Sequence, residues 1–490
     1  MLTLFGEALR RHATGLRSPA ALVAADREIS YAELDLRVRA CAAWLLAEGC
    51  APREIVGVTL ADEVPHLVVC LALLTLGVPQ AALPTFETQA VRRRLAERLA
   101  LTRVVVADAA DAIPGIVASR FDVGAPAGAP GDVTPLNADP EAIAIFHASS
   151  GTTGEPKLFA MSQALMATRQ SRRNFQEGER HLMLTKVENY PAKAARLGAI
   201  WRGCTAVLSP GPAPSTLEVA SACERHAVTR IDVGVMHLAN FLEGEIEALP
   251  AGVNVFTGGS RVPMRMREAF RARAAARLHV EYGARELGAA ASTFPVDRDP
   301  AQETVGPGVP ECEIEIVDAD GRKLAPGEVG EVRCRGIRAV SGYHDDAAAT
   351  ARHFRDGWFH PGDLGWFTPN GSLCLAGRVD DVMNLNGIKI TPLEIERVLE
   401  EEPDVRAAAA FALPSGVHGQ VPVVAVEWAG SAKPDPAALQ ARARAKLGVR
   451  APRKVFVVDA LPRNPAGKVA KGELVRWAES SGAARSAGKP

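Results

Sequence analysis

The sequence predicts an α/β protein, with a large N-terminal domain of layered α/β subdomains plus a β-rich subdomain, and a small α/β C-terminal domain. Its 490 residues exceed what one hydrophobic core usually supports, so we expect two or more domains. Helical and strand patterns alternate up to about Pro114, and again from Val207 to Tyr282. After Glu311 the pattern becomes that of paired strands, and a last alternation follows Arg378.

Hydrophobic periodicity predicts the elements of the large domain. Residues 31–48 predict an amphipathic helix, because Leu34, Val38 and Leu45 recur on one face. The longest apolar stretch, Leu67–Leu76, is well short of the ~20 residues that span a bilayer, so we expect a core helix there. The predicted strands are residues 55–60, 103–107, 142–146, 206–208, 230–234, 253–257 and 277–280.

Charge and turn composition mark the rest of the large domain. A basic helix is predicted over residues 264–277. Residues 123–140 are rich in glycine, proline and alanine, which predicts a linker. The β-rich part has predicted strands over residues 313–317 and 328–335, joined by an Asp-Ala-Asp-Gly turn.

We place the domain boundary directly before Asp380. The large domain then covers residues 1–379 and the small domain residues 380–479, while residues 480–490 form a small, polar tail that we expect to be disordered. The small domain has predicted strands over residues 407–413, 422–428 and 454–458, and helices over residues 392–401 and 436–447.

Composition excludes several function classes. The net charge of −1 offers no general attraction to nucleic acid or to an anionic membrane. The eight cysteines are scattered without a CxxC pair, which argues against a zinc site and fits a reducing compartment. The N-terminus has no basic region followed by an apolar one, so no secretion signal is visible and we expect a cytoplasmic location.

One loop concentrates hydroxyls, glycines and a lysine. Glycines let the backbone come close to a ligand and turn its N–H groups inward, while hydroxyls and a lysine add donors and a cation, so the loop suits phosphate oxygens. It is not a Walker A loop, because Pro156 precedes the lysine, and a plain surface loop is the alternative. The candidate phosphate-binding residues are Ser149, Ser150, Gly151, Thr152, Thr153, Gly154 and Lys157.

A second motif follows the predicted strand 277–280. A glycine beside an aromatic ring leaves room for a flat base, and a carboxylate such as Glu286 can hold Mg²⁺ between phosphate oxygens. A strand-ending turn with a solvated ion pair is the alternative. The motif consists of Glu281, Tyr282, Gly283, Ala284, Arg285 and Glu286, preceded by Gly259 and Ser260.

Three more motifs lie in the last third of the chain. Asp363 sits in a glycine turn, where its carboxylate could accept hydrogen bonds from two ribose hydroxyls. The stretch from Arg378 through Asp380 and Gly387 precedes Thr391-Pro392, which opens a helix with good capping chemistry. Lys468 closes the turn Pro-Arg-Asn-Pro-Ala-Gly-Lys.

Together these five motifs, in this order, resemble the adenylate-forming superfamily of acyl-CoA synthetases, peptide-synthetase adenylation domains and luciferases. The resemblance covers essentially the whole chain and is closest to stand-alone acyl- or aryl-acid ligases. It implies that a carboxylate attacks the α-phosphate of ATP with Mg²⁺ bound, giving an acyl-adenylate and pyrophosphate. A thiol, either CoA or the phosphopantetheine of a free-standing carrier protein, then displaces AMP. Such catalysis is mostly positioning and charge neutralisation.

The resemblance also implies residue roles. Lys468 would be the catalytic lysine of adenylation, Glu286 the Mg²⁺ ligand, and Arg285 a catalytic contact to the α-phosphate. The small domain would be mobile, with its hinge at Asp380 and with Gly387 facing the thiol tunnel. Asn189 and Tyr190 would line the acyl pocket. ATP and AMP would be bound by the phosphate loop together with Gly259, Ser260, Glu281, Tyr282, Gly283, Ala284, Asp363 and Arg378.

The chain departs from the family pattern at two motif positions. Arg285 stands where a threonine is usual, and it could either strengthen the phosphate contact or fill the site. Leu158 replaces the glycine that usually follows the loop lysine, which could stiffen the loop. These departures motivate an alternative function, that of a degenerate, non-catalytic nucleotide-binding homologue, although the presence of Lys468, Glu286 and Asp363 weighs against it.

The acyl-pocket segment, residues 188–193, lacks the His-x-x-Gly pattern common in acyl-CoA ligases. It also has no counterpart to the aspartate that grips an α-amino group, which argues against an ordinary amino acid as substrate. Lys193 and Arg196 could hold a second carboxylate, but a solvated helix face is the interpretation that we favour for them. The acid itself is not identified by the sequence, and a homodimer is left open.

Overall fold

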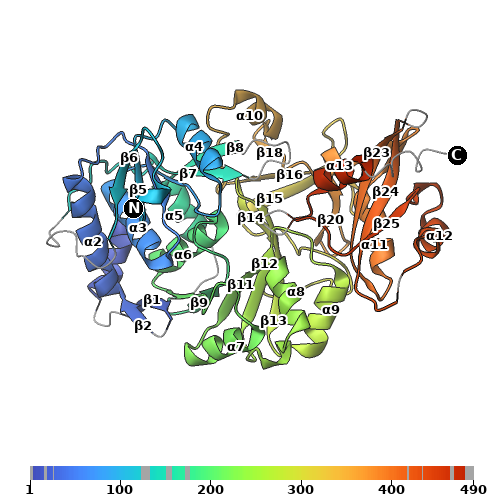
Figure 1. The fold of residues 1–490 in the computed structure, drawn as a ribbon, viewed down its shortest axis with the longest axis horizontal. Coiled ribbons are helices and arrows are strands. Elements are labelled where there is room, and N and C mark those ends of the chain that lie inside the picture. The colour runs from blue at the N-terminus through green and yellow to red at the C-terminus, as the bar shows by residue number, and fades with distance from the viewer. Residues whose placement is uncertain are drawn as a thin grey trace. The chain divides into compact units, whose positions relative to one another are not determined.

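The computed structural model describes residues 4–15, 19–25, 27–122, 133–149, 157–171, 177–415, 419–432, 434–463 and 468–480. The chain forms two compact units (Figure 1). The first unit comprises residues 1–295, 309–313 and 335–359, and the second comprises residues 296–308, 314–334 and 360–490. The boundary before Asp380 stays a prediction. Among the described helices, none combines the length and apolar character that crossing a membrane requires.

A six-stranded sheet in the first unit has the order β6-β5-β3-β4-β7-β8. The strands from β6 to β7 are parallel, and β8 pairs antiparallel with β7. The strands are β3 Val56–Thr59, β4 Gln80–Ala82, β5 Arg103–Val106, β6 Val117–Arg120, β7 Ile143–Ser149 and β8 Lys157–Ser162. The helices of this part are α1 Phe5–Ala13, α2 Tyr31–Ala47, α3 Glu63–Leu76, α4 Gln89–Arg98 and α5 Gln163–Ser171.

An eight-stranded sheet, also in the first unit, has the order β14-β13-β12-β11-β9-β10-β1-β2. Its strands run parallel except at the two edges, where β14 and β2 are antiparallel to their neighbours. The strands are β1 Ala20–Ala24, β2 Arg27–Ser30, β9 Arg180–Met183, β10 Thr205–Leu208, β11 Arg230–Gly234, β12 Asn254–Gly258, β13 Arg277–Ala284 and β14 Gly288–Ser292. The helices are α6 Tyr190–Arg202, α7 Thr216–Arg225, α8 Val235–Glu243 and α9 Met264–Arg273. The predicted helix 264–277 is wrong at its end, because β13 begins at Arg277.

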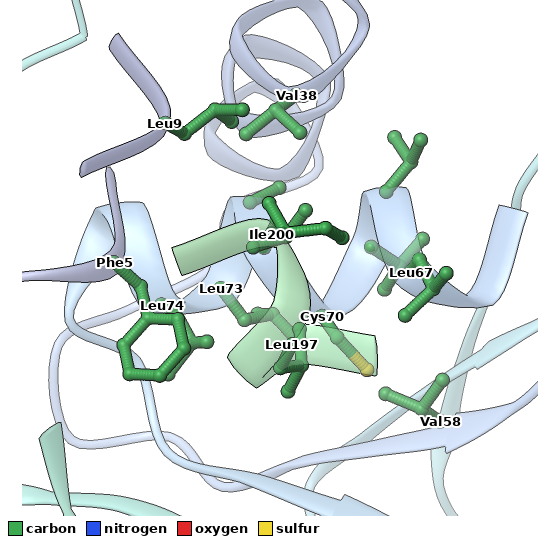
Figure 2. Close-up of a cluster of buried hydrophobic side chains, with 14 of the residues drawn as sticks. Phe5, Leu9, Val38, Val58, Leu67, Cys70, Leu73, Leu74, Leu197 and Ile200 are labelled. Atoms are coloured by element: carbon green, nitrogen blue, oxygen red, sulfur yellow. The ribbon is translucent and has the colours of Figure 1, made fainter. Parts of the chain in front are cut away.

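The core of the first unit lies where four helices meet, as Figure 2 shows. Phe5 and Leu9 of α1 and Val38 of α2 belong to the same buried cluster as α3 and α6. The predicted core helix is confirmed, since every residue from Leu67 to Leu74 within α3 is buried. The amphipathic pattern of residues 31–48 is confirmed as α2, which buries Leu34 and Leu45 completely.

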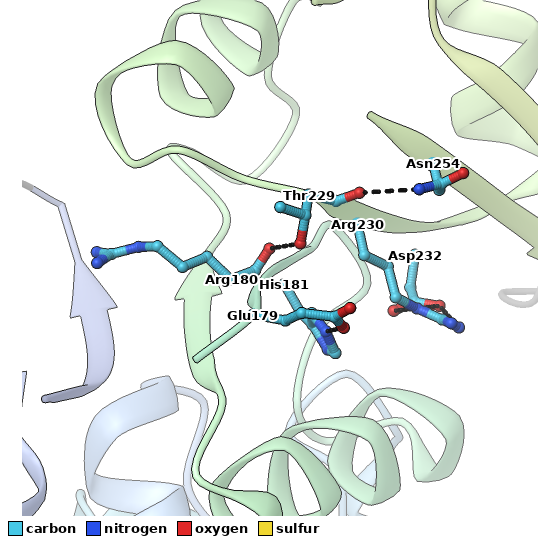
Figure 3. Close-up of polar contacts among 7 residues, drawn as sticks. All are labelled: Glu179, Arg180, His181, Thr229, Arg230, Asp232 and Asn254. Atoms are coloured by element: carbon cyan, nitrogen blue, oxygen red, sulfur yellow. Dashed lines mark hydrogen bonds and ion pairs between the residues drawn. The ribbon is translucent and has the colours of Figure 1, made fainter. Parts of the chain in front are cut away.

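A polar network lies at the amino ends of β9, β11 and β12 (Figure 3). We call it the amino-end network; its residues are Glu179, Arg180, His181, Thr229, Arg230, Asp232 and Asn254. Glu179 Oε2 lies 3.0 Å from His181 Nε2, and Arg230 donates to Asp232 at 2.6 and 2.9 Å. The Arg230 guanidinium also covers the Phe256 ring at 3.5 Å. Asp232 therefore neutralises Arg230 from two residues away, whereas Arg180 pairs with the distant Glu28 at 2.5 Å.

The β-rich part of the chain is built of paired strands. Strands β15 Cys312–Val317, β16 Gly330–Gly336, β19 Asp363–Phe367 and β20 Leu373–Arg378 pair in that order. In the first unit, β17 Phe354–Arg355 and β18 Trp358–Phe359 form a hairpin after helix α10 Ala347–His353. The last sheet has the order β22-β21-β24-β23, with β25 pairing to β24.

Three strands and two helices of this last part were predicted; β23 and β24 are longer than predicted, β25 is one residue shorter, and β21, β22 and α13 were not predicted. The strands are β21 Met383–Leu385, β22 Ile388–Ile390, β23 Val405–Ser415, β24 Gly419–Trp428 and β25 Val455–Val458, with helices α11 Pro392–Glu400, α12 Pro436–Leu447 and α13 Lys471–Ser480. Helix α11 opens on the predicted capping chemistry, because Thr391 donates through its backbone and hydroxyl groups to Glu394.

Candidate active site

Two predicted nucleotide-binding segments, residues 258–260 and 281–286, lie side by side at the carboxyl ends of β12 and β13. Gly258 pairs with Glu281, and a Cβ added to Gly258 would lie 2.4 Å from the Glu281 carbonyl oxygen. A Cβ added to Gly283 would lie 2.1 Å from a backbone oxygen of β14. Both glycines are therefore required for the backbones to approach so closely.

Arg169, on helix α5, holds the second of these segments and was not predicted from the sequence. Its guanidinium donates to the carbonyl oxygens of Arg285 at 3.0 Å, Glu286 at 2.7 Å and Arg338 at 2.9 Å. It also donates to the Tyr190 hydroxyl at 2.7 Å. An arginine in a helix carries no sequence signal that separates it from a surface arginine, so only the fold identifies this role.

The predicted Mg²⁺ ligand and the predicted phosphate-loop lysine meet at one tyrosine. The Tyr343 hydroxyl donates to Glu286 Oε1 at 3.0 Å, and Lys157 Nζ lies 5.2 Å from the centre of the Tyr343 ring. Lys157 Nζ is also 2.7 Å from His353 Nε2. Because an ammonium group can only donate, Nε2 is the acceptor in this contact. Tyr343 and His353 belong to no motif that we selected from the sequence.

The Glu286 carboxylate fits a Mg²⁺ ion that is shared with phosphates. Its side chain is buried, and Oε2 has no hydrogen-bond partner within the described ranges. Those ranges also contain no group of three or more histidines, cysteines and acids that could enclose a metal. Mg²⁺ is commonly held by one or two carboxylates plus substrate phosphates, so a single carboxylate is sufficient here.

The two departures from the motif pattern each have a structural consequence. Arg285 donates through Nη1 to the carbonyl oxygen of Ala148, in the strand that leads into the phosphate loop. Burial lowers the pKa of Arg285, while the neighbouring Glu286 raises it. Leu158 is 1% exposed and belongs to a buried cluster with Phe146, so it anchors the start of β8 in the core.

The predicted acyl-pocket residues lie at the start of α6. Asn189 is the N-cap of this helix and Tyr190 is its first residue. The Tyr190 ring lies 3.8 Å from the His147 ring, centre to centre. Beside them is a cavity, which we call the α6 cavity; it is lined by His147, Arg169, Gln170, Tyr190 and Lys193 together with apolar side chains of α1, β7, β8, α5 and α6.

The expectation of a solvated helix face at Lys193 and Arg196 is wrong. Their exposed fractions are 1% and 0%. The physical reason is that α6 packs against α1, α3 and α5, so these positions do not reach solvent. Arg196 donates to both carboxylate oxygens of Glu63, at 2.7 and 2.9 Å, and to the Met183 carbonyl oxygen at 3.2 Å.

The predicted ribose-binding residues lie together in the second unit. Asp363 and Arg378 are cross-strand neighbours in β19 and β20, and Arg378 Nη1 donates to Asp363 Oδ1 at 2.8 Å. The same nitrogen donates to the Pro361 carbonyl oxygen at 2.7 Å. Gly362, which lies between Pro361 and Asp363 in the sequence, has φ +80°, a conformation that favours glycine.

Three other predicted residues of the second unit are exposed. Asp380 lies in a 3₁₀ turn, and Lys468 stands directly before Val469, which bridges to Arg463. Gly387 has φ +89° and follows Asn386 at φ +50°, as a two-residue type I′ hairpin loop between β21 and β22 requires. The functional roles of all three stay predictions.

Part of the phosphate loop lies outside the described residues. Ser149 ends β7 and pairs with Lys157 at the start of β8. The positions between them that the structure does not describe are Ser150, Gly151, Thr152, Thr153 and Gly154, along with residues 155 and 156.

Comparison with known proteins identifies the family of the chain. Residues 9–344 match the family model of the AMP-binding enzyme, and residues 394–468 match that of the AMP-binding enzyme C-terminal domain. The chain is 31% identical to salicyl-AMP ligase / salicyl-S-ArCP synthetase of Mycobacterium tuberculosis, over 91% of this chain and 85% of that one. It is 34% identical to a probable CoA ligase of Humulus lupulus, over 37% of this chain and only 34% of that one. Amide bond synthetase McbA of Marinactinospora thermotolerans superposes with a TM-score of 0.85 at 27% identity, covering 96% of this chain and 99% of that one. The chain therefore belongs to the family of AMP-binding, adenylate-forming enzymes.

Proposed function

We propose that the protein is an ATP-dependent carboxylic acid–thiol ligase. In the first step a carboxylate oxygen of the acid attacks the α-phosphorus of ATP, the bond from that phosphorus to the bridging oxygen breaks, and pyrophosphate leaves. In the second step a thiol sulfur attacks the acyl carbon, the bond to the AMP oxygen breaks, and the thiol proton passes to solvent. The thioester and AMP are the products.

The observation that carries this proposal is the arrangement of Lys157 and Glu286 around Tyr343. A cation suits the phosphate oxygens, and a buried carboxylate with one unpartnered oxygen suits the metal that accompanies them. Mg²⁺, when bound, would neutralise phosphate charge. Arg169 would keep the 281–286 segment in place, because it holds two of its carbonyl oxygens.

The second unit would supply ribose binding and the catalytic lysine. Asp363, already oriented by Arg378, would accept from ribose hydroxyls. Lys468 would stabilise charge in the adenylation transition state. The small domain would turn at Asp380 between the two steps and present the Gly387 segment to the thiol.

The proposal is tested by measuring pyrophosphate release from ATP with aryl, short-chain, medium-chain and dicarboxylic acids. Lys468→Ala is expected to abolish adenylation while thioester formation from a supplied acyl-adenylate continues. Equal loss of both half-reactions would contradict the role of Lys468. ATP binding by folded protein with no pyrophosphate release from any acid would favour the alternative, a non-catalytic nucleotide-binding homologue.

The acceptor is tested separately, once an acid is known. The names of the relatives point to CoA or to the carrier ArCP as acceptor, and that of the McbA structure points to an amine. Each is offered to the acyl-adenylate, and AMP release is followed. We expect a thiol to be consumed. If an amine is consumed and no thiol is, the second step of the proposed reaction forms an amide and not a thioester.

A further inference from the structure

Lys193 is a buried cation that faces the α6 cavity without a hydrogen-bond partner. Its side chain is 1% exposed, and Lys193 Nζ has no hydrogen-bond partner in the part of the chain that the structure describes. An unpaired ammonium in an apolar interior is costly, because the group loses its hydration and gains nothing in return. An anion that enters the cavity would compensate this charge.

Two acids close to α6, Glu188 just before the helix and Glu63 bonded to Arg196 within it, already have other partners. Both carboxylate oxygens of Glu63 accept from Arg196. Glu188 accepts from the backbone N–H of Thr85 at 2.5 Å and from the Thr85 hydroxyl at 3.1 Å. No residue that lines the α6 cavity is acidic.

The histidines and the thiol near Lys193 supply no negative charge. Burial lowers the pKa values of His66 and His147 well below the usual range, and the nearby Lys193 lowers them further. Burial raises the pKa of the Cys70 thiol, and Lys193 partly offsets that rise. A neutral thiol is only a weak acceptor, so it does not compensate a full positive charge.

The cavity also holds an unmatched acceptor. Gln170 Oε1 is buried without a hydrogen-bond partner, while the remaining lining is mostly apolar. An unmatched cation set among apolar side chains suits one anionic group at the end of a hydrocarbon skeleton, with the rest of the skeleton outside the cavity. Tyr190 lines the same cavity and bonds through Arg169 to the 281–286 segment, so the cavity adjoins the predicted site of adenylation.

We propose that Lys193 binds a second carboxylate of the acid that is activated, so that the substrate class is dicarboxylic acids. This inference rests on the proposed function of the same site. Lys193 follows Tyr190 by three residues on one face of α6, about 4.5 Å along the helix axis. The second carboxylate therefore lies roughly one helical turn beyond Tyr190, which favours compact diacids over long ones.

The experiment compares acids in pairs that share a skeleton: butyrate with succinate, and benzoate with phthalate and isophthalate. Pyrophosphate release is measured for the wild type and for Lys193→Met, which removes the charge and nearly conserves the volume. We expect kcat/KM for the preferred diacid to fall on the order of a hundredfold in the variant, because a buried polar pair is lost. For the matched monoacid the value should stay within about twofold or rise.

The control is Lys446→Met, which removes an exposed lysine of α12 that pairs with Glu401. Lys446→Met should change kcat/KM for neither the diacid nor the matched monoacid. Thermal unfolding should show that Lys193→Met is at least as stable as the wild type without ligand, since it removes an unpaired buried charge. Equal losses for diacid and monoacid in Lys193→Met, or a wild type that prefers monoacids, would overturn the Lys193 assignment and leave the ligase function standing.

Calorimetric binding of the diacids themselves, in the presence of ATP analogue and Mg²⁺, separates the two proposals. If no acid yields pyrophosphate yet a diacid binds to the wild type and not to Lys193→Met, the ligase function fails and the carboxylate site remains. If no diacid binds, or both proteins bind it equally, the carboxylate site is overturned.

Discussion

The two ends of the parallel strands of the first unit use charge in different ways. At the amino ends, Arg230 pairs with Asp232 and His181 with Glu179, each two residues away in the same stretch of chain (Figure 3). At the carboxyl ends, Glu286 meets Tyr343 from 57 residues away, and Lys157 meets His353 from 196 residues away.

The difference follows from what the charges face. Charges in the amino-end network are matched by carboxylates and an aromatic face of the protein, so they stabilise the sheet. Lys157 has a ring and an imidazole beside it, and Glu286 has one phenol. Within the described residues, the Tyr343 hydroxyl and the His353 imidazole orient these two charges at the end of the strands where we propose that ATP binds.

The largest effect should come from Glu286→Gln. Loss of the carboxylate removes the proposed metal ligand, and we expect pyrophosphate release to fall by roughly 10²- to 10³-fold. Thermal unfolding should change little, because the amide oxygen still accepts from Tyr343. Glu179→Gln, in the amino-end network, is the matched control and should leave the rate unchanged. Equal rates of pyrophosphate release in Glu286→Gln and Glu179→Gln would show that the amino and carboxyl ends of the strands do not differ in function.

Asp232→Ala should act on stability instead of activity. It leaves the buried Arg230 without its bidentate partner, and we expect a loss of about 2 kcal/mol in the free energy of unfolding. Asp232→Asn keeps a hydrogen-bond acceptor and should lose less. Denaturant titration measures both. A specific loss of kcat/KM in folded Asp232→Ala would show that the amino ends also serve the site.

Tyr343→Phe tests whether the tyrosine orients Glu286. The variant keeps the ring beneath Lys157 and removes the hydroxyl that donates to the carboxylate, so we expect about a tenfold lower rate of pyrophosphate release. Tyr31→Phe is the control, because among the described residues the Tyr31 hydroxyl donates to the carbonyl oxygens of Ile200 and Cys204 and to no acidic side chain. Tyr31→Phe should lower the free energy of unfolding and leave the rate of pyrophosphate release unchanged. A lower rate in Tyr31→Phe together with an unchanged rate in Tyr343→Phe would contradict the role of Tyr343.

The smallest effect is the pH dependence that arises from His279. Burial and the neighbouring Arg230 lower the pKa of His279 to about 4, so the folded protein keeps it neutral. The unfolded chain takes up that proton near pH 6.5, so this contribution to stability is present above pH 6.5 and is lost as the pH falls towards 4. His279→Gln should therefore lose less stability between pH 7 and pH 5, by about 1 kcal/mol after allowing for solvent screening. Identical slopes for both proteins, measured by denaturant titration, would contradict this role.

Local patterns predicted most of the elements correctly. The apolar face of residues 31–48 became α2, and residues 436–447 became α12 with the same limits. Strands β23 and β24 extend beyond their predicted ends, because pairing between them continues past the apolar positions. Helix α9 stops short of its prediction, since a basic sequence at a helix end carries no signal for the following strand.

Local sequence determined the five motifs and their order, and with them the family, because glycine turns, hydroxyls and motif lysines act through neighbours in the chain. It also determined the amino-end pairs, which lie two residues apart. Only the tertiary structure decided that Arg169 holds the 281–286 segment, that Tyr343 joins Lys157 to Glu286, and that Lys193 is buried. The physical reason is that burial and contact depend on which helices and loops pack together. The sequence around a lysine of α6 is the same whether that face of the helix is exposed to water or packed against α3.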